Sequence, residues 1–385
     1  MDRRVLLLAL ATFVTGTAEN IVIGILPDIA GGLGVSIGLA GQLTAIFSIT
    51  FALAAPLALL LTARFERKGA FTAALAAFLL CNLLAAASPG YGVLFAARIG
   101  MAAASATIAL LATMLATELV DERMKGRAIG MIFMGVSGSL VLGVPIGMLV
   151  SSLAGWRSVF LALAALAAGV LIVCRLKLPD IGASRQGSPD YGTHLRSTPL
   201  ASAQLVSILM ISGHFVLFGY LSPYIADVLG VTGAGIVLGF VAFGVAGVSG
   251  GYLGGLAADK VTPRRAIVLV PAGYLAALLL IPFAAGTSLA FFPVMMVWAC
   301  LSWMISPVVQ SFLIATGPDT AEAGVSLNLS AMHIGVGLGT ALGGVAVERV
   351  PIVYLPGIGA GLAALALAAA ALAYRGAGRR TGMVV

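Results

Sequence analysis

Charged side chains are scarce in this chain of 385 residues, because Asp, Glu, Lys and Arg together make up only 9% of it. Hydrophobic residues make up 61%, and the mean hydropathy is +1.11. Soluble globular domains carry about 25% charged residues, so this scarcity excludes that class. The composition indicates a membrane protein in which each buried charge needs an explanation.

Cysteine is scarce as well. Cys81, Cys174 and Cys300 are scattered and have no paired spacing, which argues against a disulfide framework and against a cysteine metal site. The chain has only three histidines and no H-E-x-x-H motif. A membrane enzyme would need a nucleophile with its base, or a metal cluster. We therefore expect no enzyme and no bound metal or organic cofactor.

Long hydrophobic runs are abundant. About 20 helical residues cross a hydrocarbon core of about 30 Å, and twelve segments reach that length, each bounded by charge, proline or glycine. The predicted spans are 5–26, 39–61, 70–87, 93–115, 129–153, 159–176, 200–225, 236–258, 266–285, 289–314, 324–347 and 353–374. They predict an all-α membrane protein.

An internal repeat divides the chain. ILPDIAGGLGVS at 25–36 returns as LSPYIADVLGVT at 221–232, which places Gly34 on Gly230. Two similar halves of a membrane protein are typical of transporters. We predict an N-terminal six-helix bundle at 1–178, a cytoplasmic linker at 179–199 that is rich in Gly, Ser and Pro, and a C-terminal six-helix bundle at 200–385. His194 falls in this linker, where we expect a solvated loop residue.

The basic residues predict the orientation. Twelve spans with both termini on one side place 18 of the 21 Lys and Arg residues there, while Arg157 and Arg349 fall on the other side and Arg98 lies inside a span. By the positive-inside rule, both termini are cytoplasmic. The net charge of +7 is then an orientation signal, and we expect contact with the lipid bilayer and none with nucleic acid.

Two loops carry a family resemblance. LTARFERKG, between the second and third spans, and its repeat GGLAADKVTPRR resemble the signature loop of the major facilitator superfamily, Gly-x-Leu-x-Asp-Arg-x-Gly-Arg-Arg. The first loop departs from it, because Ala63 stands where the family has Asp and Glu66 where it has its second Gly. The resemblance implies two pseudo-symmetric bundles of six helices and a charged gate at these loops; plain cytoplasmic anchoring of basic residues is the alternative. The expected gating residues are Arg64, Arg67, Lys68, Asp259, Lys260, Arg264 and Arg265.

The fifth span is rich in glycine. Its sequence GVSGSLVLGVPIGM resembles the antiporter signature of the drug:proton efflux branch of that superfamily. Small residues at these spacings let another helix approach closely, and a proline removes one backbone bond so that a helix can bend. We expect conformational roles for Gly135, Gly138, Gly143, Pro145 and Gly147, with packing alone as the alternative.

The resemblance extends over the whole chain. The stretch KGRAIGMIFMGVSGSLVLGVPIGM, with the later segments GHFVLFGYLSPY, WACLSWMISPVVQSFLI and SLNLSAMHIGVGLGTALGG, is similar to sugar, purine and chloramphenicol-type exporters. It most resembles bacterial purine base and nucleoside efflux pumps.

Glu19 is the outstanding candidate for proton coupling. It alone among fourteen acidic residues lies well within a predicted span, and a charge at membrane depth costs at least about 2.5 kcal/mol on insertion scales, so such a group is by default functional. Arg98 is its expected partner, because each lies about seven residues, or about 10 Å, from the outer end of its span. The resemblance implies proton transfer at the arginine of span 4; a permanent structural ion pair is the alternative.

His214 and a set of polar and aromatic residues complete the expected site. His214 sits next to the repeat image of Glu19 and is either a proton relay or a neutral hydrogen-bonding residue. The expected substrate lining combines flat rings with amide and imidazole groups, which suits a planar heterocycle; helix packing or interface anchoring is the alternative. The lining residues are Tyr220, Trp298, Trp303, Gln310, Asn328 and His333.

The sequence therefore predicts a monomeric exporter of a bacterial inner membrane that exchanges protons for small neutral compounds such as purine bases and nucleosides. A broad multidrug or chloramphenicol and sugar-type exporter is the alternative. A non-transporting receptor or scaffold is a further alternative, but it would not require a charged pair at membrane depth.

Overall fold

The fold is helical throughout the part of the chain that is described. The structure is a computed structural model that describes residues 3–62, 65–121, 124–179 and 191–381, and these ranges contain no strand. Twelve of their helices are long and apolar enough to cross a membrane. This confirms the predicted fold class. Two compact units, Met1–Gln186 and Gly187–Val385, are each described by themselves below, and their division falls inside the predicted linker.

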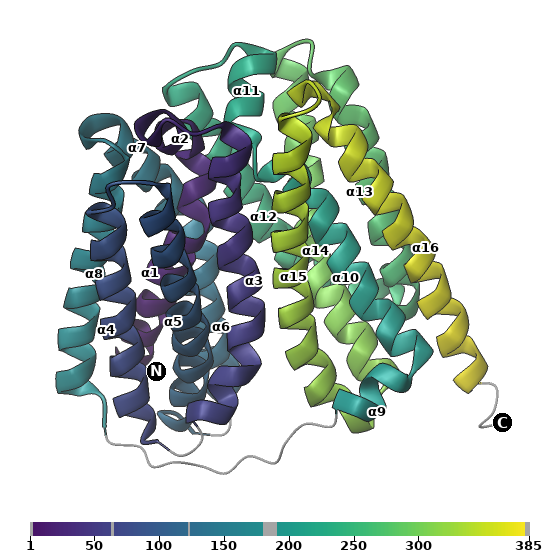
Figure 1. Cartoon of the computed structure of the whole chain (residues 1–385). Helices are drawn as coiled ribbons and strands as arrows, with labels where there is room; N and C mark the ends of the chain where they lie inside the picture. The colour runs from purple at the N-terminus through teal and green to yellow at the C-terminus, as the bar shows by residue number, and fades with distance from the viewer. Residues whose placement is uncertain (1–2, 63–64, 122–123, 180–190, 382–385) are drawn as a thin grey trace. The chain divides into compact units, whose positions relative to one another are not determined.

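Six spans build the first unit, on the left in Figure 1. Its helices are α1 (Arg3–Gly24), α2 (Leu26–Leu33), α3 (Ile37–Thr62), α4 (Arg67–Ala86), α5 (Tyr91–Glu118), α6 (Lys125–Gly138), α7 (Val144–Ala154) and α8 (Trp156–Lys177). A π-helical turn, η2 (Ser139–Gly143), joins α6 to α7, so the fifth span runs through α6, η2 and α7.

The second unit repeats this order. Its helices are α9 (Tyr191–Arg196), α10 (Thr198–Phe218), α11 (Leu221–Leu229), α12 (Ala234–Val261), α13 (Pro263–Ala284), α14 (Ser288–Thr316), α15 (Ala321–Val347) and α16 (Leu355–Thr381), with short 3-10 turns before α15 and α16. α1 packs on α6 and α8 as α10 packs on α15 and α16. α3 and α4 pack on α5 as α12 and α13 pack on α14, and α4 packs on α8 as α13 packs on α16. The sequence repeat is therefore a repeat of packing.

The first and seventh spans end earlier than the hydrophobic runs suggest. The first run was expected to end at residue 26, just before Pro27, and the seventh to continue past Pro223 to residue 225, but α1 ends at Gly24 and α10 at Phe218. Pro27 and Pro223 lack the N–H that would continue the helix, so a second, short helix starts in each case. Gly34 and Gly230 end these short helices in the left-handed region, with φ of 64° and 65°, which glycine adopts without strain.

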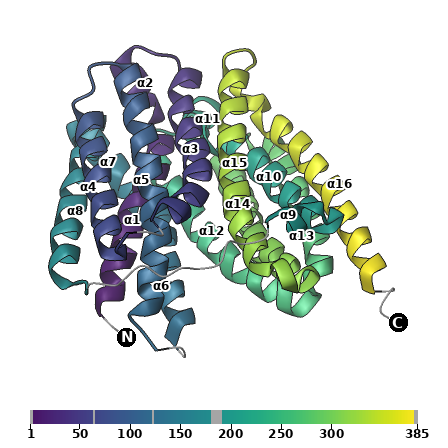
Figure 2. The same ribbon diagram turned by 60° about the horizontal axis from the view of Figure 1, so that its bottom comes forward.

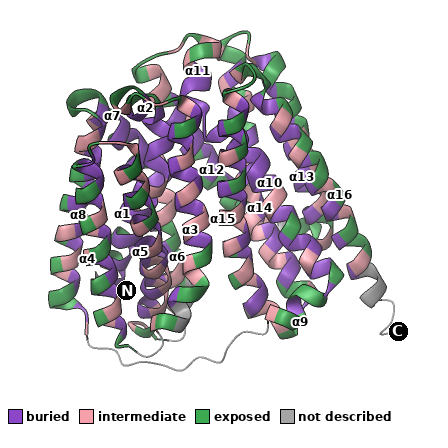
Figure 3. Ribbon diagram, in the orientation of Figure 1, coloured by how far each residue is buried: buried purple, intermediate pink, exposed green. Residues whose placement is uncertain are grey.

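Apolar side chains cover the outer surface of both units. Figure 3 shows buried positions gathered inside each unit and exposed positions on the outward faces of the helices. Large apolar residues are among the most exposed, including Leu153 at 87%, Phe283 at 87% and Leu289 at 88%. Water would disfavour such a surface, whereas lipid tails solvate it, so these faces fit a bilayer.

One prediction about the linker is wrong. His194 was expected to be a solvated loop residue, but it lies on α9 and is fully buried. Its ring packs where Gly324 of α15 leaves space, since a Cβ there would lie 2.5 Å from His194 Cε1. Within the expected linker, 180–190 lie outside the described residues, whereas 191–196 form this helix and α10 begins at Thr198.

Candidate functional site

Arg98 is the most completely enclosed charge in the first unit. It lies on α5 with no exposed surface, and its guanidinium reaches backbone carbonyls of two other helices. Nε donates to Leu43 O of α3 at 3.1 Å, and the two terminal nitrogens donate to Ala18 O and Glu19 O of α1 at 2.5 and 3.1 Å. The guanidinium also stacks over the Phe47 ring at 4.2 Å. A planar fork with five donors suits such a divided set of acceptors.

Glu19 lies beside this arginine. The hydrogen bond from Arg98 to the Glu19 carbonyl places the two residues at one level, and the Glu19 charge acts on the guanidinium. The Glu19 side chain is partly exposed, although its neighbours Ala18 and Asn20 are buried. Apart from Glu118 at the end of α5, it is the one acid in any described span. The site therefore combines a carboxyl side chain that is partly exposed at the surface of the unit with a guanidinium that is fully buried within it.

Four glycines of the fifth span face α1. A Cβ on Gly135 would lie 2.2 Å from Ala9 O, and one on Gly143 would lie 2.1 Å from Thr17 Oγ1. One on Gly147 would lie 2.4 Å from Ile21 Cδ1, whereas Gly138 is less confined, with Phe13 at 3.6 Å. These distances leave no room for a side chain at three of the four positions. α1, which carries Glu19, therefore rests directly on the backbone of this span.

Pro145 lies in the first turn of α7, directly after η2. A proline inside a helix removes one backbone hydrogen bond, and a π-helical turn is a common place for that irregularity. The eleventh span repeats the glycine contacts in the second unit, because a Cβ on Gly339 would lie 2.3 Å from Ser212 O of α10.

His214 lies inside an aromatic cluster of the second unit. Its ring centroid is 4.6 Å from that of Trp298, 5.2 Å from those of Phe215 and Phe218, and 5.6 Å from that of Phe243. The side chain is 1% exposed, and neither ring nitrogen has a hydrogen-bond partner among the described residues. The structure thus brings His214 and Trp298 together, but it gives the imidazole no proton-exchange partner in this conformation.

Tyr220 and Asn328 lie in the packed interior of the same unit. Tyr220 is fully buried, and its hydroxyl donates to Thr340 O at 2.9 Å. The Asn328 amide donates to Gln204 Oε1 at 3.1 Å and to Ser207 Oγ at 2.8 Å, while its own Oδ1 has no partner among the described residues. Asn328 therefore holds α15 to α10, and Tyr220 holds α15 to the turn between α10 and α11.

Trp303, Gln310 and His333 are the partly exposed members of the expected lining. Trp303 packs against α12, where a Cβ on Gly247 would lie 2.9 Å from its ring. The Gln310 amide donates to Ser306 Oγ at 3.2 Å, and His333 Nδ1 lies 2.9 Å from Leu329 O of its own helix. The indole Nε1 of Trp303 is nevertheless buried and has no hydrogen-bond partner among the described residues.

The two signature loops are only partly described. Arg64 lies outside the described residues, as does the side chain of Asp259. Lys68 is partly exposed, and Lys260 and Arg265 are exposed. Arg67 forms an ion pair with Glu118 of α5, and Arg264 donates to Tyr374 O at 3.1 Å and stacks over the Tyr374 ring at 4.3 Å.

The sequence analysis did not identify the residues that contact Arg98. Leu43 and Phe47 on α3, which enclose Arg98, carry no charge and gave no signal. It also missed a buried polar chain in the second unit. His194 Nδ1 lies 3.1 Å from Thr320 Oγ1, and His194 Nε2 lies 3.2 Å from Gln204 Nε2, whose amide also donates to Gly324 O at 2.8 Å. The sequence signal that could have indicated this buried polar chain was an isolated polar residue in an apolar segment, such as Gln204.

Two bundles of six spans with matching packing, one holding a carboxyl and an arginine at membrane depth, define a membrane transporter. Residues 8–340 match the family model described as Major Facilitator Superfamily. The chain belongs to the major facilitator superfamily, as its loops and fifth span suggested, and it is a multi-pass membrane transporter rather than an enzyme. Gly247–Gly251 fits the G-x-S-x-G pattern of hydrolases, but it lies inside the continuous helix α12 instead of at a strand–helix turn.

Relatives and solved structures agree with this assignment. The chain is 31% identical over 358 residues to the uncharacterised MFS-type transporter YbcL of Bacillus subtilis, which covers 93% of this chain and 92% of the relative. It is 30% identical over 352 residues to a chloramphenicol efflux pump of Mycobacterium tuberculosis, covering 89% and 85%. A bacterial homologue of the human lysosomal transporter Spinster shares the fold, with a TM-score of 0.75, 17% identity and coverage of 97% and 96%.

Proposed function

We propose that this protein is a proton-coupled exporter that exchanges protons for small, neutral, planar or amphipathic compounds by alternating access. The observation that carries the proposal is the pair of Glu19 and Arg98, in which a partly exposed carboxyl lies beside a cation fixed by backbone carbonyls. When Glu19 is protonated, the positive charge of Arg98 is not balanced. When Glu19 releases the proton, its carboxylate balances that charge. That alternation supplies the differential free energy that a conformational cycle needs.

The second unit supports a neutral aromatic substrate. Arg98 already opposes the charge of Glu19, so no spare carboxylate remains to hold a lipophilic cation. Trp303 offers a partly exposed aromatic ring, and Gln310 and His333 are partly exposed side chains with hydrogen-bonding groups. Tyr220, Trp298 and Asn328 lie in the packed interior of the same unit. Purine bases, nucleosides and their analogues combine a flat ring with edge donors and acceptors, which is the chemistry this set recognises.

His214 enters the coupling step only in a conformation that opens its aromatic cluster. In the conformation described, Phe218 and Trp298 flank the ring and exclude water from it. The coupling step therefore rests first on Glu19 and Arg98.

A chloramphenicol exporter is the second candidate. It is favoured by the 30% identity to a protein named as a chloramphenicol efflux pump, and chloramphenicol is itself neutral and aromatic. Both candidates share the proton coupling proposed at Glu19, and they differ only in the compound that the lining accepts.

The proposal includes an orientation and a location. Both termini, the two signature loops and α9 lie on the cytoplasmic side of a bacterial inner membrane, because the basic residues concentrate there. The charged loops act as a gate in this arrangement, since Arg67 and Glu118 join α4 to α5 by an ion pair that a movement of the helices would break. We propose that the monomer is the transporting unit.

Substrate-induced proton release from the purified protein in weakly buffered detergent tests the proposal. Adenine, guanosine, chloramphenicol and a quaternary ammonium dye are added in turn, and the pH is recorded. Neutral aromatic compounds should release protons from the wild type and not from Glu19→Gln. Release of equal size from both proteins would remove Glu19 from the mechanism.

A further inference from the structure

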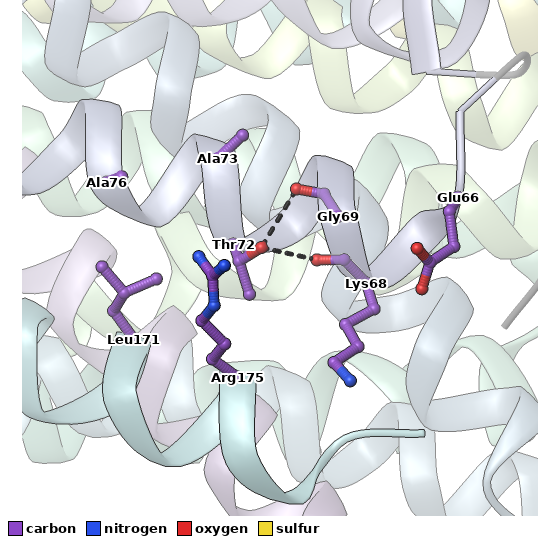
Figure 4. A pocket seen from close by; sticks show the side chains of 8 residues that line it. All are labelled: Glu66, Lys68, Gly69, Thr72, Ala73, Ala76, Leu171 and Arg175. Carbon is purple, nitrogen blue, oxygen red and sulfur yellow. Dashed lines mark hydrogen bonds between the residues drawn. The ribbon is translucent and has the colours of Figure 1, made fainter. Parts of the chain in front are cut away.

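A pocket opens between the first turn of α4 and the last turn of α8, at the surface of the first unit. Its volume is about 490 Å³, and Figure 4 shows side chains from both helices around it. Figures 1 and 2 both show α4 and α8 side by side, and they pack directly on each other. The lining residues are Glu66, Lys68, Gly69, Thr72, Ala73, Ala76, Leu171 and Arg175.

One end of the pocket is charged. Lys68 from α4 and Arg175 from α8 both line it, and Glu66 lies on the other side of Lys68 from Arg175 (Figure 4). Two cations and one carboxylate give the lining a formal charge of +1. Glu66 is the N-cap residue of α4 but makes no side-chain cap hydrogen bond, so the positive end of the helix adds to the field. This end fits one phosphate monoanion.

The other end of the pocket is apolar. Ala73, Ala76 and Leu171 line it, and Thr72 lies between the two ends with its hydroxyl already donating to Lys68 O at 2.9 Å. From Glu66 to Ala76 the helix rises about 15 Å, from the charged loop toward the middle of the span. Leu80, which is exposed on α4 about one turn beyond Ala76, continues this apolar surface. A ligand with a phosphate head and a hydrocarbon tail matches this order of groups.

The corresponding helices of the second unit hold a cation as well. α13 and α16 pack as α4 and α8 do, and Arg264 is the second residue of α13 as Lys68 is the second residue of α4. Arg264 folds onto α16, where it stacks over Tyr374 and donates to its carbonyl. Arg264 of the second unit therefore lies against Tyr374, whereas Lys68 and Arg175 of the first unit line the pocket.

We propose that this pocket is a binding site for an anionic membrane phospholipid. The phosphodiester lies between Lys68 and Arg175, and an acyl chain follows Ala73, Ala76 and Leu171 into the membrane. The head group binds at the level where α4 leaves the bilayer, which is the cytoplasmic leaflet in the orientation proposed above. This site is separate from Glu19 and Arg98, and its test does not depend on transport.

Native mass spectrometry of the full-length protein tests the proposal, with phosphatidylglycerol, phosphatidylcholine and inorganic phosphate as separate probes. Each basic side chain near a membrane surface is worth about 1 kcal/mol toward an acidic lipid, or about a fivefold change in affinity. Arg175→Gln should weaken phosphatidylglycerol binding about fivefold, and Lys68→Gln with Arg175→Gln about 25-fold. Ala73→Trp should also weaken binding, because it fills the pocket without changing its charge.

Lys177→Gln is the matched control, because Lys177 is an exposed cation in the same last turn of α8 but does not line the pocket. It should leave phosphatidylglycerol binding unchanged, and Arg175→Lys should retain most of it. An equal loss in Lys177→Gln would show general attraction to basic residues and overturn the site. Equal binding of phosphatidylcholine, or displacement of the lipid by millimolar inorganic phosphate, would likewise overturn the assignment to an anionic lipid.

Discussion

At the scale of single residues, the position of Arg98 does not depend on the charge of Glu19. Three backbone carbonyls and the Phe47 ring hold the guanidinium, and backbone carbonyls do not titrate. The arginine is therefore held in place by groups that keep their charge state. In the proposed mechanism, Arg98 anchors three helices, and the carboxyl of Glu19 beside it exchanges the proton.

Glu19→Gln should keep the fold and substrate binding but abolish efflux driven by a proton gradient. Glutamine has nearly the same shape and cannot titrate, and the hydrogen bonds from Arg98 to α1 go to backbone oxygens that the substitution retains. Efflux from proteoliposomes with an imposed pH gradient measures the effect. Asp28→Asn is the control, because Asp28 is an exposed acid on α2 that accepts from Ser151. Undiminished pumping by Glu19→Gln would contradict the coupling role.

Arg98→Lys should lose both stability and transport. A single ammonium cannot reach Leu43 O on α3 and the two carbonyls of α1 together, so at least one buried acceptor loses a charged donor. Lost hydrogen bonds to charged groups cost about 1.5–3 kcal/mol each. The melting temperature in detergent and the flux in proteoliposomes measure the two effects. A lysine variant with wild-type stability would show that the carbonyl contacts contribute little.

His194 should make the second unit less stable in acid. Burial lowers the pKa of His194 below its ordinary value of 6.5, and the hydrogen bond with Thr320 opposes this in part. The unfolded chain then takes up a proton at higher pH than the folded one, so the contribution is complete above about pH 6.5 and declines as the pH falls below it. The wild type should lose more melting temperature between pH 7.5 and 5.5 than His194→Gln. Parallel curves for the two proteins would contradict this.

At the scale of elements, glycine residues mark the places where two helices pack most closely. Gly143 and Gly147 let α1 rest on the fifth span, and Gly339 plays the same part between α15 and α10. These contacts lie in both units at matching places, so each unit has a seam here at which the glycine backbone of one helix lies directly against the neighbouring helix. Such a seam lets two helices slide with little steric interlock.

Gly143→Leu or Gly147→Leu should stop transport. Even a Cβ at these positions would lie within 2.4 Å of Thr17 or Ile21, so a leucine must push α1 away. Gly130→Leu is the matched control, because it lies on α6 of the same span and a Cβ there meets nothing within 4 Å. Membrane expression and efflux should be measured for all three. Wild-type rates in the two seam variants would reduce the glycines to plain packing residues.

Much of the fold could be predicted from the sequence, because an apolar run of sufficient length has one stable form in a bilayer. The level of Arg98 beside Glu19 followed from counting residues along two antiparallel spans, and the structure joins the two residues by a hydrogen bond. The partners of Arg67 and Arg264 could not be predicted, since Glu118 and Tyr374 lie on helices far away in the sequence. The prediction that His194 is solvated was wrong for the same reason. A polar residue in a polar segment is expected to be exposed, and only the tertiary packing shows that His194 is buried.

At the scale of the whole molecule, two copies of one architecture carry different chemistry. The first unit encloses Arg98 beside the carboxyl of Glu19, and the second encloses His214 among aromatic rings. The packing is matched, but the interior polar groups are not. We expect the first unit to bind the proton and the second to supply most contacts to the transported compound.

Cells that express the protein should gain resistance to toxic purine analogues before they gain resistance to quaternary ammonium dyes. The described spans offer a cation no acid other than Glu19, which Arg98 opposes, and Glu118 at the end of α5. A growth-inhibition panel measures the order, with Glu19→Gln as the inactive control. Chloramphenicol in the same panel separates the two candidate substrates. The reverse ranking would count decisively against a neutral substrate.

The fixed charge of Arg98 has an electrical consequence. If the arginine stays in place while the carboxyl next to it gains or loses a proton, the net charge inside the membrane differs by one unit between the two states. Export of a neutral compound against one proton then moves one positive charge inward per cycle. A membrane voltage does work on that charge, about 2.3 kcal/mol for each 100 mV. Such a pump is electrogenic, so a cell at neutral external pH, with almost no proton concentration gradient, still powers it with its voltage.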